Sequence, residues 1–194
     1  MCNTTQIVQK IFKNITLTND ELHLIANTFE KVYLKKDETL LKINTTVKNQ
    51  YYVYSGCLRT FYIDKTGKEH TLQFAIEDWW ISDYTAFFSS GKAIMNIESI
   101  QNATLLKLSR TQMEHLLENI PALETFFRKK MERAFSSFQK RILSNLALSA
   151  QERYVAFVNT YPNIEQSVKN YHIASYLGIT TESLSRIRKT LAKG

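Results

Sequence analysis

The sequence contains few of the residues that build disulfide frameworks, metal centres and clusters. Only two of its 194 residues are cysteine, and Cys2 and Cys57 have no motif spacing. Two thiols exclude a disulfide framework, a zinc ribbon and a four-thiolate iron–sulfur cluster. The four histidines lie far apart and form neither a His-x-His nor a His-Glu-x-x-His motif. We therefore expect reduced thiols, no metal and no other cofactor.

Glycine and long apolar runs are also scarce. All five glycines are isolated, so the chain has neither a Gly-rich phosphate loop nor the G-x-S-x-G elbow of a hydrolase. No apolar run approaches the roughly 18 residues that span a bilayer, and the N-terminus lacks the apolar core of a signal peptide. These absences predict a cytoplasmic protein that is not an enzyme and does not act on membranes.

Positive charge is abundant and unevenly placed. The formal net charge is +7. Residues 121–145 hold six Lys or Arg against two Glu, and residues 181–194 hold four against one. This excess favours a polyanionic partner such as nucleic acid, although a basic surface alone is weak evidence because many basic proteins bind no nucleic acid.

The first half of the chain predicts a helix followed by many short strands. Thr18 and Glu21 have the T-x-x-E spacing of a capping box, which starts a helix. Beyond Lys31 the sequence changes to short β-rich runs, and two of them flank the turn-forming segment 64–67 as in a hairpin. Such closely spaced strands are typical of a β-sandwich or roll. The predicted strands are Gln50–Tyr54, Leu58–Ile63, Glu69–Ala75 and two runs within Asn96–Leu108.

A long helix is predicted after these strands. Ser109 and Gln112 form a second capping box, and Pro121 is well placed to open a helix that runs to about Asn145. Its apolar residues recur mostly every three or four positions, which predicts one buried stripe packed on the β-roll or on a partner helix. A monomeric surface helix is the alternative. The stripe comprises Leu123, Phe126, Phe127, Met131, Ala134, Phe135, Phe138, Ile142 and Leu146.

The segment Tyr171–Leu191 has the pattern of a helix, a turn at Gly178 and a second helix. Thr180 or Thr181 can cap the second helix. There the apolar stripe is narrow and consists of Leu184, Ile187 and Leu191. The opposite flank is polar and basic, as in a helix that enters a DNA major groove. That flank carries Glu182, Ser185, Arg186, Lys189 and Lys193.

Each residue type on this flank suits a part of DNA. Arg186 can bind guanine bidentately, and Glu182 can accept from the amino group of cytosine. Lys189, Lys193 and Arg188 suit phosphates, which position a protein without reading sequence. An ordinary amphipathic helical hairpin with a solvated charged face remains the alternative.

The segment resembles the DNA-binding end of the Crp/Fnr superfamily of bacterial transcription regulators. The resemblance implies that the residues at Glu182 and Arg186 contact bases, and Thr181 takes the place of a third base-reading position. The matching residues are Ile173-Ala174, Leu177-Gly178, Thr180, Glu182, Leu184, Ser185, Arg186, Ile187 and Leu191.

The resemblance extends over nearly the whole chain and implies an α+β fold. Residues 1–120 are expected to form a cyclic-nucleotide-binding-like β-roll, a double-stranded β-helix or jelly roll with flanking helices that acts as a sensor. Residues 121–146 would form the dimerisation helix. Residues 147–194 would form a small all-α helix-turn-helix domain without the full wing of many relatives, because the sequence ends at Gly194. The resemblance also implies a homodimer that binds a palindromic site on double-stranded DNA.

The sensor is expected to have a degenerate nucleotide pocket. Nucleotide-binding members of the superfamily use a Gly-Glu-Leu turn and a later Arg to hold the ribose and the phosphate. The aligned positions here are Ser82 and Asp83 for the Gly and Glu, and Ala93 for the Arg. A buried phosphate without a guanidinium is costly, so we do not expect cyclic nucleotides to bind.

Aromatic residues in the same region either line a pocket for an unknown apolar or aromatic effector or fill the barrel. The candidate pocket residues are Phe74, Trp80, Asp83, Tyr84 and Lys92.

The sequence as a whole predicts a sequence-specific DNA-binding transcription regulator. The alternative is a module that binds a cyclic nucleotide or another small ligand and acts on a protein partner rather than on DNA.

Overall fold

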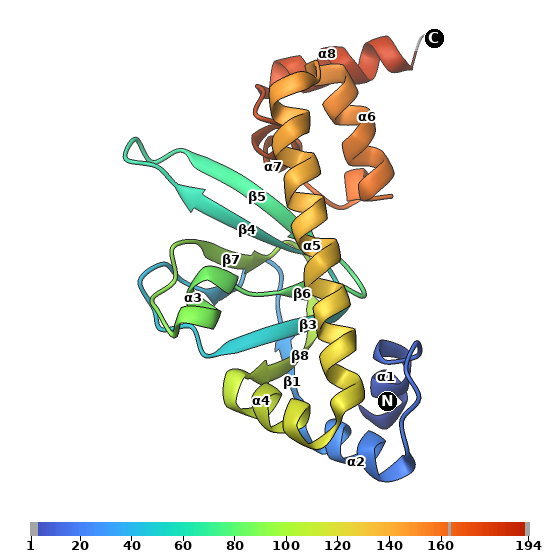
Figure 1. Cartoon of the computed structure of the whole chain (residues 1–194). Helices are drawn as coiled ribbons and strands as arrows, with labels where there is room; N and C mark the ends of the chain where they lie inside the picture. The colour runs from blue at the N-terminus through green and yellow to red at the C-terminus, as the bar shows by residue number, and fades with distance from the viewer. Residues whose placement is uncertain (1–3, 163, 193–194) are drawn as a thin grey trace.

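The computed structural model describes residues 4–162 and 164–192, and it combines two antiparallel sheets with helices at both ends of the chain (Figure 1). The capping boxes predicted at Thr18 and Ser109 are confirmed, a third is present at Ser149, and each starts a helix. The N-terminal helices are α1 (Thr4–Ile11) and α2 (Asn19–Thr28), and α4 (Arg110–Asn119) follows the strands. Within the described residues, none of the helices has the length and apolar character that crossing a bilayer requires.

The strands form a β-roll of two four-stranded sheets, in the orders β1-β8-β3-β6 and β2-β7-β4-β5. Leu58, Ile97 and Leu105 are fully buried between the sheets. The predicted hairpin is confirmed, since β4 and β5 pair from Leu58 with Ala75 to Ile63 with Glu69. The bounds are β1 (Glu30–Leu34), β2 (Thr39–Leu41), β3 (Asn49–Ser55), β4 (Leu58–Ile63), β5 (Glu69–Ala75), β6 (Trp80–Ile81), β7 (Asn96–Ser99) and β8 (Ala103–Ser109).

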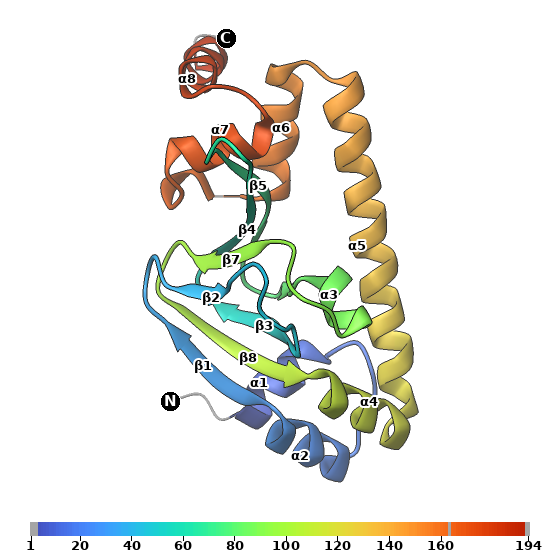
Figure 2. The same cartoon turned by 90° about the vertical axis from the view of Figure 1, so that its left-hand side faces the viewer.

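The long helix α5 (Pro121–Ala147) extends from the base of the roll to the C-terminal helices (Figures 1 and 2). Leu123 and Phe126 are buried at its beginning, where Phe126 contacts Phe12, which directly follows α1, with ring centroids 4.7 Å apart. For the rest of the helix the stripe does not pack on the roll, and its packing on a partner helix stays a prediction. There the apolar side chains are 40–80% exposed, with no cover from the described residues: Met131, Phe135, Phe138, Ile142 and Leu146.

The C-terminal helices pack directly on the roll instead of standing apart from it. They are α6 (Ala150–Thr160), α7 (Asn170–Leu177) and α8 (Thr181–Leu191), with a short 3-10 turn at Ile164–Gln166. Phe74 of β5 enters their aromatic core, with its ring centroid 5.8 Å from Tyr161 and 5.6 Å from Tyr176. Burial of these rings fixes the helices against the hairpin.

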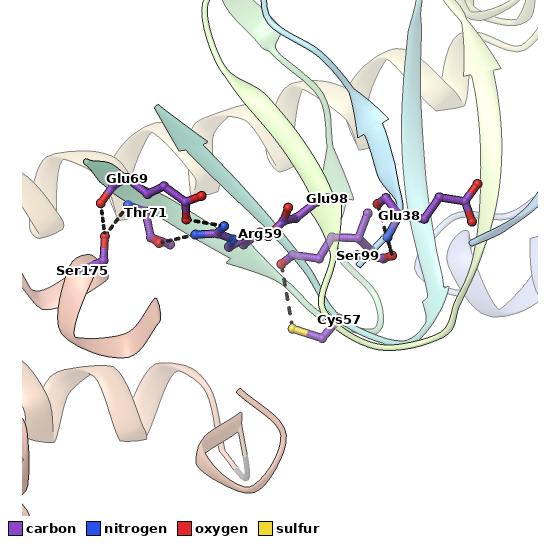
Figure 3. Close-up of polar contacts among 9 residues, drawn as sticks. Glu38, Cys57, Arg59, Glu69, Thr71, Glu98, Ser99 and Ser175 are labelled. Atoms are coloured by element: carbon purple, nitrogen blue, oxygen red, sulfur yellow. Dashed lines mark hydrogen bonds and ion pairs between the residues drawn. The ribbon is translucent and has the colours of Figure 1, made fainter. Parts of the chain in front are cut away.

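Two side chains complete this junction by bonding the backbone of β5, which is an edge strand. The Ser175 hydroxyl of α7 donates to the Glu69 carbonyl (2.8 Å) and accepts from the Thr71 N–H (2.9 Å), as Figure 3 shows. The Arg141 guanidinium of α5 donates to the Thr71 carbonyl (3.1 Å) and to the Tyr176 carbonyl (3.3 Å). Backbone groups that an edge strand would leave open are thereby satisfied across the junction.

A buried cation lies beneath α7 in the same junction. Arg59 of β4 is 1% exposed and forms ion pairs with Glu69 (2.5 Å) and Glu98 (2.6 Å) (Figure 3). His172 of α7 is buried above the same strands, and its Nδ1 has no hydrogen-bond partner within the described residues. Burial, then the charges of Arg59 and Lys169, lower the pKa of His172 from 6.5 to about 4, against a smaller opposing effect of Asp37.

We predict that His172 makes the fold sensitive to mild acid. The unfolded imidazole takes up a proton near pH 6.5, whereas the folded one stays neutral down to about pH 4. The free energy of unfolding therefore falls as the pH decreases between these values, by up to roughly 3 kcal/mol. Urea unfolding of the wild type and of His172→Leu at pH 7 and pH 5 measures this, and the wild type should lose more stability. Equal losses would contradict the prediction.

Candidate nucleic-acid interface

Helices α7 and α8 form the predicted helix-turn-helix. Gly178 ends α7 in the left-handed conformation (φ 68°), and the Ile179 N–H donates back to the Ala174 carbonyl (3.0 Å). A side chain at position 178 would meet no atom within 4 Å, so the requirement for glycine comes from the backbone conformation alone. Thr180 caps α8 by accepting from the Ser183 N–H (3.2 Å). The turn and the cap together set the direction in which α8 leaves α7.

The apolar stripe of α8 anchors the helix to the domain. Leu184 is fully buried among Ile173, Ala174 and Leu177 of α7, and Ile187 is partly buried against the same core. Figure 2 shows α8 at the outer end of the molecule, on the side of α7 away from the roll. The inward direction of the stripe leaves the opposite flank of α8 facing solvent.

This flank carries the predicted base-reading side chains. Glu182, Ser185, Arg186 and Lys189 are all exposed, and Thr181 at the start of the helix is half-buried. The Arg186 guanidinium makes only one contact within the described residues, a donation to the Ser183 hydroxyl (3.3 Å). Hydrogen bonds from its own backbone N–H and from the Thr180 and Thr181 hydroxyls lower the pKa of Glu182. Glu182 is therefore an ionised acceptor at neutral pH, as acceptance from a cytosine amino group requires.

Arg188 does not lie on this flank, which corrects its assignment to phosphate. Its guanidinium donates to the Tyr154 hydroxyl (3.1 Å) and to the Asn170 side chain (2.7 Å), and it lies 3.6 Å from a Glu165 oxygen. It therefore links α8 to α6 and α7 inside the domain. Sequence reasoning missed this role because the three partners are distant in sequence and follow no motif. Lys193, the last predicted contact, lies outside the described residues.

Of the five residues predicted to form an effector pocket, Trp80 and Tyr84 border one hollow, and Phe74, Asp83 and Lys92 do not. Phe74 is buried in the junction with the C-terminal helices. Trp80 packs among Phe29, Tyr52 and Phe127 at the base of the roll. Lys92 is exposed beside an isolated bridge to Thr46, and Tyr84 stacks on Phe88. The five side chains separate because residues 74–92 pass through two strands, a short helix and an isolated bridge, which lie in different parts of the molecule.

Comparisons with known proteins agree with this architecture. The family described as "Cyclic nucleotide-binding domain" matches residues 31–120. The "Anaerobic regulatory protein" of Pasteurella multocida is 25% identical over 196 residues, which cover 92% of this chain and 69% of the relative. The region of this chain that matches the relative includes residues of both the roll and the helix-turn-helix. Residues 31–120 belong to this domain family, and the chain as a whole is similar to transcription regulators of the Crp/Fnr superfamily.

Solved structures show the same fold. The structure of FixK2 from Bradyrhizobium japonicum has a TM-score of 0.74 at 16% identity and covers 85% of each chain. A putative Crp/Fnr-family regulator from Eubacterium rectale has a TM-score of 0.69 at 20% identity, over 92% of this chain and 85% of that one. Similarity at these identities supports the Crp/Fnr architecture and does not by itself transfer a ligand.

In this Crp/Fnr-like protein the position of the nucleotide cradle is occupied by a carboxylate. Asp83 is fully buried, and it caps α3 (Tyr84–Ser89) by accepting from the Ala86 N–H (3.2 Å). Its second oxygen accepts from the Ile94 N–H (2.7 Å), directly after Ala93. The backbone donors near the aligned phosphate position are therefore already bonded to a negative charge. An incoming phosphate would find these donors already bonded and alanine in place of the aligned Arg, so the residues present do not fit a cyclic nucleotide.

We predict that neither cAMP nor cGMP stabilises the protein. A ligand that binds only the folded state raises the melting temperature increasingly as its concentration exceeds the dissociation constant. A thermal-shift series up to millimolar nucleotide should leave the melting temperature unchanged, because Ala93 replaces the phosphate-binding Arg and Asp83 already bonds the Ile94 N–H. A clear concentration-dependent rise with either nucleotide would show that the cradle is functional.

Proposed function

We propose that this Crp/Fnr-like protein regulates transcription by binding a palindromic DNA site as a homodimer, with α8 as the recognition helix. The observation that carries the proposal is the two-faced character of α8, which is anchored by Leu184 while Glu182, Ser185 and Arg186 face solvent. Its capped N-terminal turn also presents the end of a helix at which anions are stabilised. Such a regulator would work in the cytoplasm, with the DNA.

The roles on α8 divide into base reading and positioning. Glu182 and Arg186 are four residues apart, so one major groove can receive both side chains. Lys189 lies one turn further along the same exposed flank and is placed to contact phosphate. Ser185 and Thr181 lie beside them with hydroxyls that can donate or accept. The formal charge of +7 supplies a long-range attraction to DNA.

The dimer is supported by the second half of α5. Met131, Phe135, Phe138 and Ile142 recur at spacings of four, three and four, and they form one uncovered apolar stripe. That spacing is the signature of helices that pack side by side. A second copy of α5 would cover the stripe and bring two recognition helices onto one face of DNA, as a palindromic site requires.

We predict that Arg186→Ala relaxes the DNA sequence that the protein selects. Selection from random duplexes with the wild type should enrich a palindrome, and the variant should lose preference at one base position of each half-site. The expected affinity loss at that site is about 1–3 kcal/mol for each lost bidentate contact.

Arg133→Ala is the matched control, because it removes the same charge from an exposed position on α5. It should select the wild-type palindrome with little loss of affinity. Wild-type binding should also weaken steeply with rising salt, since phosphate contacts release counterions. If the wild type enriches no palindrome, or if Arg186→Ala enriches the same site equally well, α8 does not read bases. Salt-independent binding to a protein would favour the protein-partner alternative.

We predict that Phe135→Glu dissociates the dimer. A carboxylate buried without a partner between two apolar stripes should raise the dimer dissociation constant by about 100-fold or more. Sedimentation equilibrium measures this change. Ser136→Glu places the same charge one residue away on another face of α5, and it should remain dimeric. A dimeric Phe135→Glu protein would place the interface elsewhere.

A further inference from the structure

A hollow of about 610 Å³ lies where the roll, the long helix and the C-terminal helices meet. Gln73 of β5 and Trp80 of β6 form its floor, α5 forms one side from Met131 to Asn145, and α6 and the end of α7 close the top. A volume of this size is typical of small-molecule sites. It is not the nucleotide cradle, because neither Asp83 nor Ala93 borders it.

Aromatic rings supply much of its wall. They come from β6, α3, α5, α6, α7 and the residues beside them: Trp79, Trp80, Tyr84, Phe135, Phe138, Phe157, Tyr161 and Tyr176. Rings of this kind bind flat apolar groups by burying area and by stacking. The surface is therefore suited to an aromatic or similarly apolar body.

The charges around the hollow are all of one sign. Lys140, Arg141 and Arg153 line it, and no Asp or Glu is among the described residues that do so. Arg141 donates to two backbone carbonyls, and Arg153 donates to the Leu148 and Leu177 carbonyls. These carbonyls satisfy the hydrogen bonds without neutralising the charge. Burial lowers the pKa of Arg141, as expected of a cation that has no carboxylate beside it.

We propose that this hollow binds an aromatic or apolar organic anion and that the anion is the effector of the protein. The assignment as a site rests on the aromatic walls and on the unneutralised cations, and the role as effector rests on the proposed DNA-binding function. Tyr176 and Leu177 form part of the wall at the end of α7, one residue before Gly178. A bound anion would therefore touch the helix-turn-helix directly. The α5 stripe runs along the mouth of the hollow, so a second copy of α5 would enclose the ligand.

The test uses two fluorescent probes that share a ring system. The anion is 8-anilinonaphthalene-1-sulfonate, and the neutral probe is N-phenyl-1-naphthylamine. The dimeric wild type should bind the anion saturably with one site per chain. Lys140→Gln should weaken binding of the anion by about three-fold, as expected for a partly exposed charge, and leave binding of the neutral probe unchanged. Lys129→Gln, which removes a charge from α5 outside the hollow, should leave both unchanged.

A second variant tests the location. Ala156→Trp places an indole from α6 into the hollow, and it should weaken binding of both probes by roughly tenfold or more. Val155→Trp adds the same ring at an exposed position of α6 outside the hollow, and it should bind both probes as the wild type does. Far-UV circular dichroism of each variant confirms that it is folded.

Absence of saturable binding by the wild type would overturn the inference, and it would indicate that side chains of the second copy fill the hollow. Unchanged binding by Ala156→Trp, or equal losses of both probes in Lys140→Gln, would overturn it as well. None of these results depends on DNA. If the protein selects a palindrome but binds neither probe, only the proposed site in the hollow is wrong. If it binds the probes but no DNA, the proposed regulatory function is wrong.

Discussion

The arrangement of the whole molecule depends on how the edge strand β5 is closed. Both backbone groups of Thr71 are bonded outside its sheet, the N–H to Ser175 of α7 and the carbonyl to Arg141 of α5. The Arg141 guanidinium also binds the Tyr176 carbonyl, so one side chain links three parts of the chain. These bonds hold the helix-turn-helix on the hairpin and thereby set the direction of α8. A change that competed for them would move the recognition helix.

The long helix serves two surfaces in succession. Its first turns are covered by the chain itself, through Leu123 and Phe126, and its later turns carry an uncovered stripe. An exposed row of Phe135, Phe138 and Ile142 is costly for a soluble monomer, so the sequence retains it for a partner. Arg141 lies beside the stripe and reaches the hairpin. The same helix therefore connects the proposed dimer interface, the hollow and the C-terminal helices.

The roll preserves a nucleotide-binding architecture without its chemistry. Asp83 satisfies the Ala86 and Ile94 N–H groups, which makes the loop stable in the absence of a ligand. The cationic groups lie instead at the junction with α6 and α7, where Arg141 and Arg153 face aromatic walls. The proposed effector would therefore belong to a different class of molecule, and it would bind next to the proposed DNA-binding helices.

The sequence by itself determined the local elements, because each is specified by neighbouring residues. Capping boxes, Pro121, Gly178 and the spacing of apolar residues act within a few positions, and they predicted the helices, the hairpin and the exposed flank of α8. Packing between distant segments decides which of the polar side chains are bonded inside the domain and which remain open to solvent. Arg188 resembles Lys189 in sequence, yet it is held by Tyr154 and Asn170, which are 34 and 18 residues away. Phe74 belongs to the junction for the same reason, since its partners Phe157, Tyr161 and Tyr176 lie in distant segments that packing brings to it.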